Sequence, residues 1–235
     1  MGFATNAIHV GQEPDPATGA IVAPIYQTST YVNEELGKNK GYDYARTNHP
    51  NRKALERTVA KLEGGHSAYV FSSGMAGIDA VFRLLRPGDH VVLSEAVYGG
   101  VFRLSTQLLV HFGLEFSFVD TSTPDAVRMA MRSNTKLVYI ETPANPTMTV
   151  TDIAAMSKLT NERNITLAVD NTFLSPYLQR PIELVDNRVL DDEHVAADAH
   201  LPVERDVPFA PFRVASSKGP LNSTTIAATA RINLL

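Results

Sequence analysis

The sequence has no cysteine, and its basic residues do not cluster. The first absence excludes a disulfide framework, a thiolate metal site and a cysteine nucleophile. The chain of 235 residues has a formal net charge of -4, and its dispersed lysines and arginines disfavour binding to nucleic acid. Any catalytic or binding chemistry must therefore come from other residue types.

Long hydrophobic runs are missing too. No apolar run approaches the roughly 20 residues of a membrane-spanning helix. The N-terminus also lacks the basic and apolar regions of a secretory signal. We therefore expect a cytoplasmic protein without a membrane partner. Because 44% of its residues are hydrophobic, the chain can bury a sizeable core.

From residue 66 onward, short β-rich runs alternate with segments of helical periodicity. Apolar residues recur with helical spacing over residues 78–85 and nearly so over 102–109, which predicts two amphipathic helices. Strands are predicted at residues 68–71, 90–94, 115–120, 136–141 and 165–170. Strands that alternate with helices indicate crossovers, so the predicted class is α/β, with a mainly parallel sheet and helices on both faces.

Composition divides the chain into three regions. Residues 1–50 are rich in proline and polar residues with little periodicity, and we expect an N-terminal arm. Residues 51–184 form the predicted α/β domain, which begins with a helix over about 52–62. Residues 185–235 hold only one of the 14 glycines and lack a clear period. We expect no regular structure in this tail, which is disordered or out of register, and we expect an unpaired sheet edge unless the tail or a partner covers it.

Two loops at the expected carboxyl edge of the sheet have features of a ligand site. The stretch "YVFSSGMAGIDAVF" places Ser73, Gly74 and Met75 between a strand and a helix, where free N–H groups stabilise an anion such as phosphate. The stretch "EAVYGG" places Tyr98 where its ring can stack on a planar ligand. Each also has an ordinary interpretation, as a helix cap with a turn and as a tyrosine packed over the sheet edge.

Two later strand ends add polar side chains to this edge. Asn145 lies in the loop "ETPANPT", which begins at Glu141, and Asp170 ends the last predicted strand. A carboxylate at a strand end is often the N-cap of the next helix, but it can also hold the proton of a ring nitrogen in a cofactor. A phosphate site, a stacking ring and a carboxylate together indicate pyridoxal 5'-phosphate (PLP).

Five stretches carry a more specific resemblance: "YARTNHPNRKALE" (44–56), "SSGMAGI" (72–78), "VYGG" (97–100), "ETPANPT" (141–147) and "VDNTFLSPYLQRPIEL" (169–184). They resemble the Cys/Met metabolism, or transsulfuration, family of fold-type-I PLP-dependent enzymes, which includes cystathionine γ-synthase, cystathionine γ-lyase and methionine γ-lyase. The resemblance implies the large PLP-binding domain of that family. It also implies sulfur amino acid metabolism, by γ-replacement or γ-elimination on homoserine esters or cystathionine.

The resemblance implies roles for single residues. Tyr44 and Arg46 match an element that contacts the cofactor phosphate of a neighbouring subunit, which implies a homodimer or homotetramer. Tyr98 matches a stacking tyrosine that also moves protons, and is the expected catalytic residue. Asp170 matches the partner of the pyridine nitrogen. The expected cofactor-binding residues are Tyr44, Arg46, Ser73, Gly74, Met75, Tyr98, Asn145 and Asp170, with no metal ligand.

Some positions depart from the family pattern. Asn48, His49 and Asn51 stand where relatives usually have Gly, Asn and Thr, and Val101 replaces a small polar residue. These differences weaken the assignment to a subclass but not the resemblance to the family.

The family element expected after Leu184, similar to "GADIVVHSATKYLGGH", is missing. It carries the Schiff-base lysine, and family spacing puts that lysine near Val195, where no amine is present. The only lysine after Lys158 is Lys218. We interpret Lys218 as a surface lysine, with an insertion that returns it to the site as the alternative.

Two expectations concern the end of the chain. It stops at Leu235, before the C-terminal domain that the family uses to bind the substrate carboxylate. A loss of reading frame near codon 185, or a truncated coding sequence, would explain the change in pattern.

Three functions remain open at this point. The first is a transsulfuration enzyme, for which the sequence does not separate γ-synthase from γ-lyase or β-lyase. The second is a catalytically impaired homologue that binds PLP weakly or not at all. A generic nucleotide-binding module is disfavoured, because no G-x-G-x-x-G or P-loop follows a strand.

Overall fold

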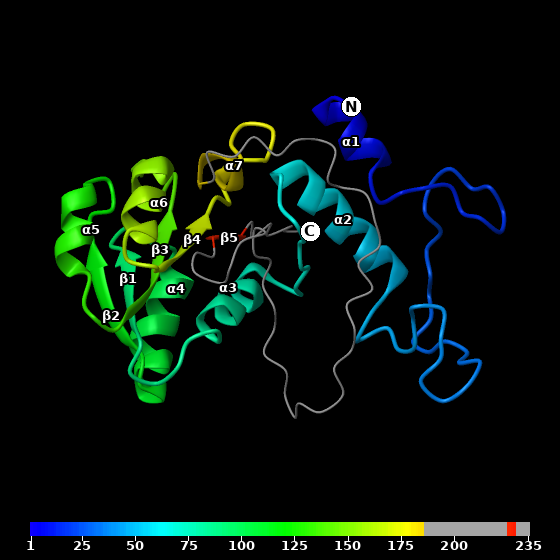
Figure 1. Ribbon diagram of the computed structural model, residues 1–235, viewed down its shortest axis with the longest axis horizontal. Helices are drawn as coiled ribbons and strands as arrows, with labels where there is room; N and C mark the ends of the chain where they lie inside the picture. The colour runs from blue at the N-terminus through cyan, green and yellow to red at the C-terminus, as the bar shows by residue number, and fades with distance from the viewer. Residues whose placement is uncertain (186–224, 229–235) are drawn as a thin grey trace. The chain divides into compact units, whose positions relative to one another are not determined.

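A computed structural model describes residues 1–185 and 225–228, which belong to two units that meet in sequence between Val70 and Phe71 (Figure 1). Lys218 and the position of the expected lysine near Val195 lie outside the described residues. No helix within the described ranges is long and apolar enough to cross a membrane.

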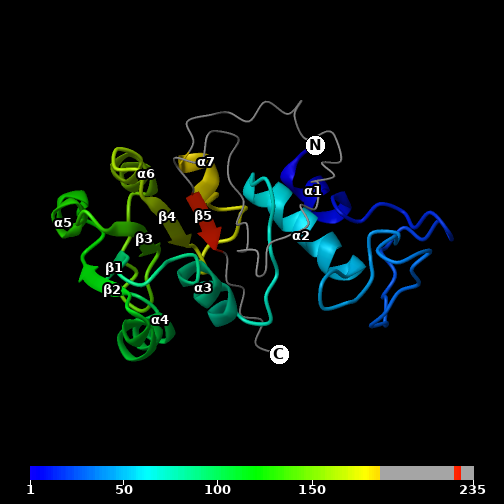
Figure 2. The same ribbon diagram turned by 60° about the horizontal axis from the view of Figure 1, so that its bottom comes forward.

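The second unit is built on a parallel sheet of five strands in the order β2-β1-β3-β4-β5 (Figure 2). The strands are β1 (His90–Ser94), β2 (Glu115–Val119), β3 (Thr135–Glu141), β4 (Thr166–Asp170) and β5 (Thr225–Ala228). Helical segments connect β1 to β2, β2 to β3 and β3 to β4, as the parallel strands of one sheet require. The predicted α/β class and four of the predicted strands are confirmed.

The helices of this unit cover the two faces of the sheet. They are α3 (Gly74–Phe82), α4 (Gly99–Arg103), α5 (Pro124–Ala130), α6 (Ile153–Asn161) and α7 (Pro181–Val185), with a π-helical turn η1 (Leu104–Leu108) and a 3-10 turn η2 (Leu109–Phe112). Because side chains alternate along a strand, Tyr139 and Ala168 share a core with α3, while Val138 and Val169 share one with α6. Burial on both faces explains why the strands are almost continuously hydrophobic.

Local sequence signals mark where these elements begin and end. The Ser73 hydroxyl accepts from the Ala76 N–H at 3.1 Å and caps α3, and the Asp152 carboxylate accepts from the Ala155 N–H at 3.0 Å and caps α6. Thr123 is the N-cap of α5, with Pro124 in its first turn. The turn before β1 places Gly88 at a φ of 90°, a left-handed conformation that favours glycine.

Two expectations about strands are wrong. Residues 68–71 form no strand, because the Val70 N–H donates to the Glu56 carboxylate at 3.2 Å instead of to a neighbouring strand. The tail does supply a strand, since residues 225–228 pair in parallel with β4 and cover its edge. Hydrophobicity alone does not identify a strand that depends on a distant partner.

The helix predicted over residues 102–109 also differs from expectation, because it changes type at Leu104. The Ser105 hydroxyl donates to the Val101 carbonyl at 2.9 Å, and the Thr106 hydroxyl donates to the Phe102 carbonyl at 2.7 Å. Hydroxyls that bond to the preceding turn bend helices.

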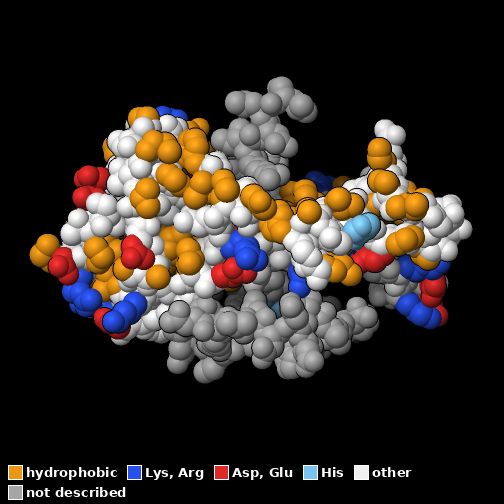
Figure 3. All heavy atoms as spheres, turned by 90° about the horizontal axis from the view of Figure 1, so that it is seen from above, with side chains coloured by type: hydrophobic (Ala, Val, Ile, Leu, Met, Phe, Trp, Pro, Cys, Tyr) orange, Lys and Arg blue, Asp and Glu red, His pale blue; other side chains and the backbone are white. Residues whose placement is uncertain are grey.

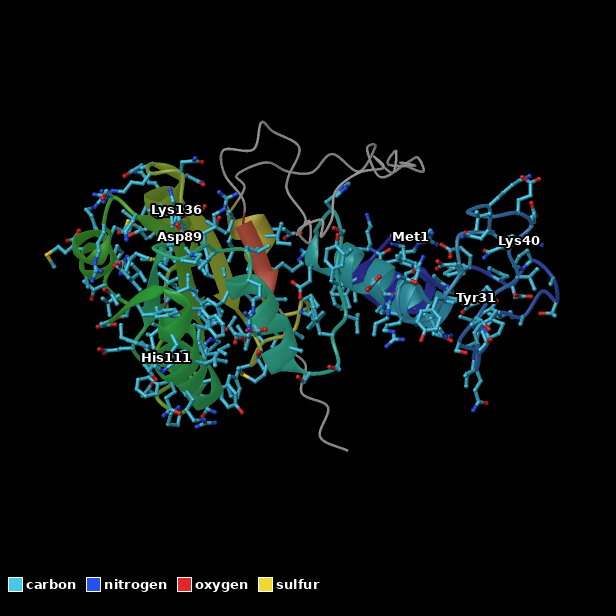
Figure 4. The ribbon with its side chains drawn as sticks, turned by 90° about the horizontal axis from the view of Figure 1, so that it is seen from below. Met1, Tyr31, Lys40, Asp89, His111 and Lys136 are labelled. Atoms are coloured by element: carbon cyan, nitrogen blue, oxygen red, sulfur yellow. The ribbon has the colours of Figure 1, made fainter. Side chains whose placement is uncertain are left out.

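The first unit contains α1 (Phe3–His9) and α2 (Pro50–Glu63). The predicted helix over about 52–62 is therefore confirmed, although it belongs to this unit and not to the unit that holds the sheet. Between the two helices the chain has only isolated bridges, such as Thr30 with Tyr44, among its described residues. Figure 4 labels Tyr31 and Lys40 in this segment.

Many hydrophobic side chains of this connecting segment are exposed, as the orange atoms in Figure 3 illustrate. Ile25 is 90% and Val32 is 88% exposed, whereas β1, β3 and β4 bury all their apolar side chains. The arm therefore has little core of its own, as its weak periodicity predicts.

Candidate active site

Two buried carboxylates lie side by side at the carboxyl edge of the sheet. Glu141 ends β3 and Asp170 ends β4, and the two residues are partners in the parallel register. Their exposed fractions are only 3% and 4%. Buried carboxylates need hydrogen-bond donors, and Glu141 and Asp170 accept from different kinds of donor.

Glu141 connects two loops through their backbones. Its Oε2 accepts from the Tyr98 N–H at 2.6 Å, and its Oε1 accepts from the Asn145 N–H at 3.0 Å. One carboxylate thus holds both the loop after β1 and the loop after β3, each of which carries a predicted site residue. Burial raises the pKa of Glu141, the two backbone hydrogen bonds oppose this shift, and the charge of Asp170 adds to it.

A series of hydrogen-bonded hydroxyl groups begins at the backbone of Glu141. The Glu141 N–H donates to the Ser94 hydroxyl at 3.2 Å, which bonds to the Thr121 hydroxyl at 2.8 Å, which in turn bonds to the Thr151 hydroxyl at 2.8 Å. These contacts link the ends of β1, β2 and β3. A polar cavity of about 270 Å³ lies beside them and is lined by Ser94, Glu95, Ala96, Asp120, Thr121, Ser122, Glu141, Ala144 and Thr149.

Asp170 is held by hydroxyl donors and one backbone group. The Tyr139 hydroxyl donates to its Oδ2 at 2.8 Å, and both the N–H and the hydroxyl of Thr172 donate to its Oδ1. These bonds hold both carboxylate oxygens in place, and each oxygen keeps a lone pair that can accept a hydrogen bond from a ligand. The predicted interpretation of Asp170 as a helix N-cap does not apply, because no helix follows it directly.

The N-terminus of α3 supplies anion-binding groups. Ser73 caps the helix, and the N–H groups of Gly74 and Met75 have no hydrogen-bond partner in the described part of the chain. Free N–H groups at the positive end of a helix stabilise a phosphate. Ser73 is exposed and Gly74 is buried, so an anion would approach from the Ser73 side.

Gly100 brings the α3 loop and the Tyr98 loop into contact. A Cβ atom at Gly100 would lie 2.5 Å from Cε1 of Tyr98 and 2.7 Å from Sδ of Met75, closer than real atoms approach. At Gly99 the nearest atom would be the flexible end of Arg103, at 3.3 Å. Of the two glycines in "YGG", Gly100 is therefore the one that allows the close approach.

The predicted residues of the second unit thus gather at one edge. Ser73, Gly74 and Met75 start α3, Tyr98 precedes α4 with its ring 40% exposed, and Asp170 ends β4. Asn145 follows β3 and is exposed.

Tyr44 and Arg46 belong to the first unit, where they form a local pair. The Arg46 guanidinium donates to the Tyr44 hydroxyl, and its Cζ lies 4.9 Å from the centre of the Tyr44 ring. Both residues are exposed. The pair therefore presents a cation on a preorganised support, as a phosphate contact requires.

Three of the four residues that depart from the family pattern make contacts that hold the arm. Asn51 donates to the Pro24 carbonyl at 2.7 Å and accepts from the Tyr26 N–H at 2.9 Å. The His49 ring bonds to the Tyr26 carbonyl at 2.9 Å, and Asn48 donates to the Gly41 carbonyl at 3.1 Å. Their contacts in the first unit are structural.

Sequence reasoning missed Tyr139 and the hydroxyl chain. Tyr139 stands two residues before Glu141, so it points to the same face of β3. A tyrosine two positions before a strand-end acid was the available signal.

Comparisons with known proteins show the family of the chain. A profile of the family described as Cys/Met metabolism PLP-dependent enzyme matches residues 4–189. A probable cystathionine gamma-synthase from Herpetosiphon aurantiacus is 47% identical over 189 residues, which cover 80% of this chain and 59% of the relative. A cystathionine gamma-lyase from Bacillus subtilis (strain 168) is 49% identical over 180 residues, which cover 77% and 48% of the two chains.

Solved structures show the same fold. The crystal structure of metB from Corynebacterium glutamicum superposes with a TM-score of 0.77 at 48% identity, over 78% of this chain and 48% of the other. A cystathionine gamma-lyase from Lactobacillus plantarum complexed with L-serine gives a TM-score of 0.76 at 45% identity, over 78% and 48% of the two chains. The predicted fold is confirmed, and the chain spans about half the length of the curated relatives it matches.

Proposed function

Because the chain belongs to the Cys/Met metabolism family of PLP-dependent enzymes, we propose that it binds PLP at the carboxyl edge of its sheet. We further propose that its activity is transsulfuration, by γ-replacement or γ-elimination on a homoserine ester or on cystathionine. Relatives named cystathionine gamma-synthase and cystathionine gamma-lyase support this reaction class. Relatives of similar identity named cystathionine beta-lyase keep elimination at the β-carbon open.

The observation that carries the proposal is the hydrogen bonding of Asp170. This carboxylate is 4% exposed, yet it is held by three donors and stands at the strand end where a ring nitrogen would lie. A helix cap would need no such arrangement. The buried carboxylate, the unpaired N–H groups of Gly74 and Met75 and the Tyr98 ring together fit the three parts of PLP.

In this proposal each residue has one task. PLP, when bound, supplies an electron sink for the substrate α-carbon. Asp170 holds the proton on the ring nitrogen, and Gly74, Met75 and the Ser73 hydroxyl bind the phosphate. The Tyr98 ring stacks on the cofactor, and its hydroxyl holds or moves a proton near the substrate. Asn145 lies near the ring hydroxyl.

The arm has a role in an oligomer under the same proposal. Tyr44 and Arg46 would contact the cofactor phosphate of a neighbouring subunit, and their exposure and mutual contact support this use. We therefore propose a homodimer or homotetramer, located in the cytoplasm.

A second candidate is a homologue that binds PLP without turnover. It is favoured by the sequence near Val195, which has no lysine, and by Lys218 as the only lysine after Lys158. Without an amine at the site, PLP is held only by noncovalent contacts.

The two candidates are separated by cofactor titration followed by borohydride reduction and peptide mass analysis. Visible absorbance and circular dichroism report PLP binding. A pyridoxyl group on Lys218, together with turnover of cystathionine, supports the first candidate. Saturable binding without a modified lysine or turnover supports the second, and an absence of saturable binding contradicts the proposal that the chain binds PLP.

A further inference from the structure

Tyr139 is a fully buried tyrosine that the proposed roles leave unexplained. Its exposed fraction is 0%, and its hydroxyl donates to Asp170 Oδ2 at 2.8 Å. A phenylalanine would fill the same core without a polar group to satisfy. A buried hydroxyl is destabilising unless it is hydrogen-bonded, so the choice of tyrosine here points to the carboxylate.

The direction of this hydrogen bond is fixed. Burial raises the pKa of Tyr139 well above its usual value, and the negative charge of Asp170 raises it further. Tyr139 therefore stays protonated and always donates. Because Thr172 donates to Oδ1, both carboxylate oxygens have a donor, and the plane of the Asp170 carboxylate is set by its neighbours.

The ring of Tyr139 is also fixed in orientation. It stacks on Phe82, with centroids 5.7 Å apart and an interplanar angle of 26°. Phe82 is the last residue of α3, the helix that starts at the proposed phosphate site. Packing therefore aims the hydroxyl up the face of the sheet toward Asp170, and α3 contributes to both ends of the proposed cofactor site.

From this geometry we propose that Tyr139 is a positioning residue, which acts through Asp170 on the ring nitrogen of PLP. The inference rests on the proposed function, because it assigns a partner to Asp170. The Tyr139 hydroxyl orients the carboxylate so that one free lone pair faces the ring and can accept the proton of the ring nitrogen.

The test compares two cofactors in the variant Tyr139→Phe, which keeps the stacked ring and removes the hydroxyl. The probes are PLP and its 1-deaza analogue, in which a C–H group replaces the ring nitrogen. We expect the dissociation constant for PLP to rise about tenfold, as the loss of one hydrogen bond to a charged group implies. Affinity for the analogue should change less than about twofold, because the analogue offers Asp170 no proton.

Two controls accompany this comparison. Tyr69→Phe removes a hydroxyl from a tyrosine that is 49% exposed, and should leave both affinities unchanged. In an Asp170→Asn background, Tyr139→Phe should no longer weaken PLP binding, because the residue through which it acts has changed. Urea unfolding verifies that each variant is folded.

Each outcome has a defined meaning. Equal losses of affinity for PLP and for the analogue would show a merely structural role and overturn the inference. Unchanged PLP affinity in Tyr139→Phe would overturn it as well, while the proposed function would stand. If the unsubstituted chain bound no PLP, the proposed function and the inference would both fail.

Discussion

The carboxyl edge of the sheet and the N-terminal arm hold their predicted site residues in different ways. At the edge, the loops of Tyr98 and Asn145 are joined by Glu141, which lies 43 residues from Tyr98 in sequence. In the arm, Arg46 is held by Tyr44, two residues away. Long-range buried contacts make the geometry of the edge part of the fold, whereas the arm pair is independent of it. Substitutions at the edge should therefore change both stability and cofactor binding, and those in the arm only binding.

The largest effect is expected for Asp170→Asn. This change keeps the side-chain shape but removes the charge that would pair with a protonated ring nitrogen. Because loss of one partner from a buried pair costs about 3–5 kcal/mol, PLP affinity should fall roughly a hundredfold or more. Equilibrium dialysis against PLP measures it. Asp152→Asn is the matched control, since asparagine also caps helices and α6 should be unaffected.

Glu141→Gln should rank second, with an effect on stability. Glutamine has only one acceptor oxygen, so one of the N–H groups of Tyr98 and Asn145 loses its partner. We expect the free energy of unfolding to fall by about 1–3 kcal/mol in urea titrations. Glu162→Gln, at an exposed ion pair with Arg128, should change it by less than about 1 kcal/mol. If the two substitutions lowered the free energy of unfolding equally, the buried carboxylate at the sheet edge would be no more important for stability than an exposed one.

The pH dependence of stability gives a second test of Glu141. Burial raises its pKa in the folded state above 4.5, so the folded protein retains a proton that the unfolded chain has lost. The contribution of this group is present below the unfolded pKa and is lost as the pH rises through the folded pKa. The free energy of unfolding of the unsubstituted protein, relative to Glu141→Gln, should thus decrease over that interval. An increase would contradict the assigned direction.

The two glycines after Tyr98 provide a matched pair at the edge. Gly100→Ala forces a Cβ against Tyr98 and Met75 and should destabilise the protein by about 1–3 kcal/mol, with weaker PLP binding. Gly99→Ala meets only the end of Arg103 and lies in α4, where alanine is favoured over glycine by about 0.5–1 kcal/mol. Thermal denaturation followed by circular dichroism compares them. A lower stability of Gly99→Ala than of Gly100→Ala would contradict this packing.

Arg46→Ala should have the smallest effect on folding. Its contacts are local and exposed, so the free energy of unfolding should change by less than about 0.5 kcal/mol. PLP affinity should fall only at protein concentrations at which the subunits associate. Sedimentation experiments at the same concentrations would measure this association. A loss of affinity in the isolated monomer would show that the arm acts within its own chain.

The predictable parts of this molecule are those with local signals. Thr123 and Asp152 are capping residues and Gly88 is a turn residue at element boundaries, and the positions of Gly74 and Asp170 at the sheet edge followed from the alternation of strands and helices. The contacts that organise the site were not predictable, because they join residues far apart in sequence. The bond from Tyr139 to Asp170 spans 31 residues.

The errors have the same origin. The sequence of residues 68–71 is typical of a strand, but the Val70 N–H donates a hydrogen bond to the carboxylate of Glu56 in α2. Residues 225–228 have no strong pattern, yet they pair with β4. In both cases a distant partner decides the structure.

The central claim is that Asp170 holds the proton of a PLP ring nitrogen, and nitrogen NMR of PLP labelled with ¹⁵N in its ring tests it most directly. The spectrum should be recorded with the unsubstituted chain at a pH where free PLP has an unprotonated ring nitrogen. The account predicts the chemical shift of a protonated nitrogen in the bound cofactor, and its loss in Asp170→Asn. An unprotonated ring nitrogen in the bound cofactor would contradict it.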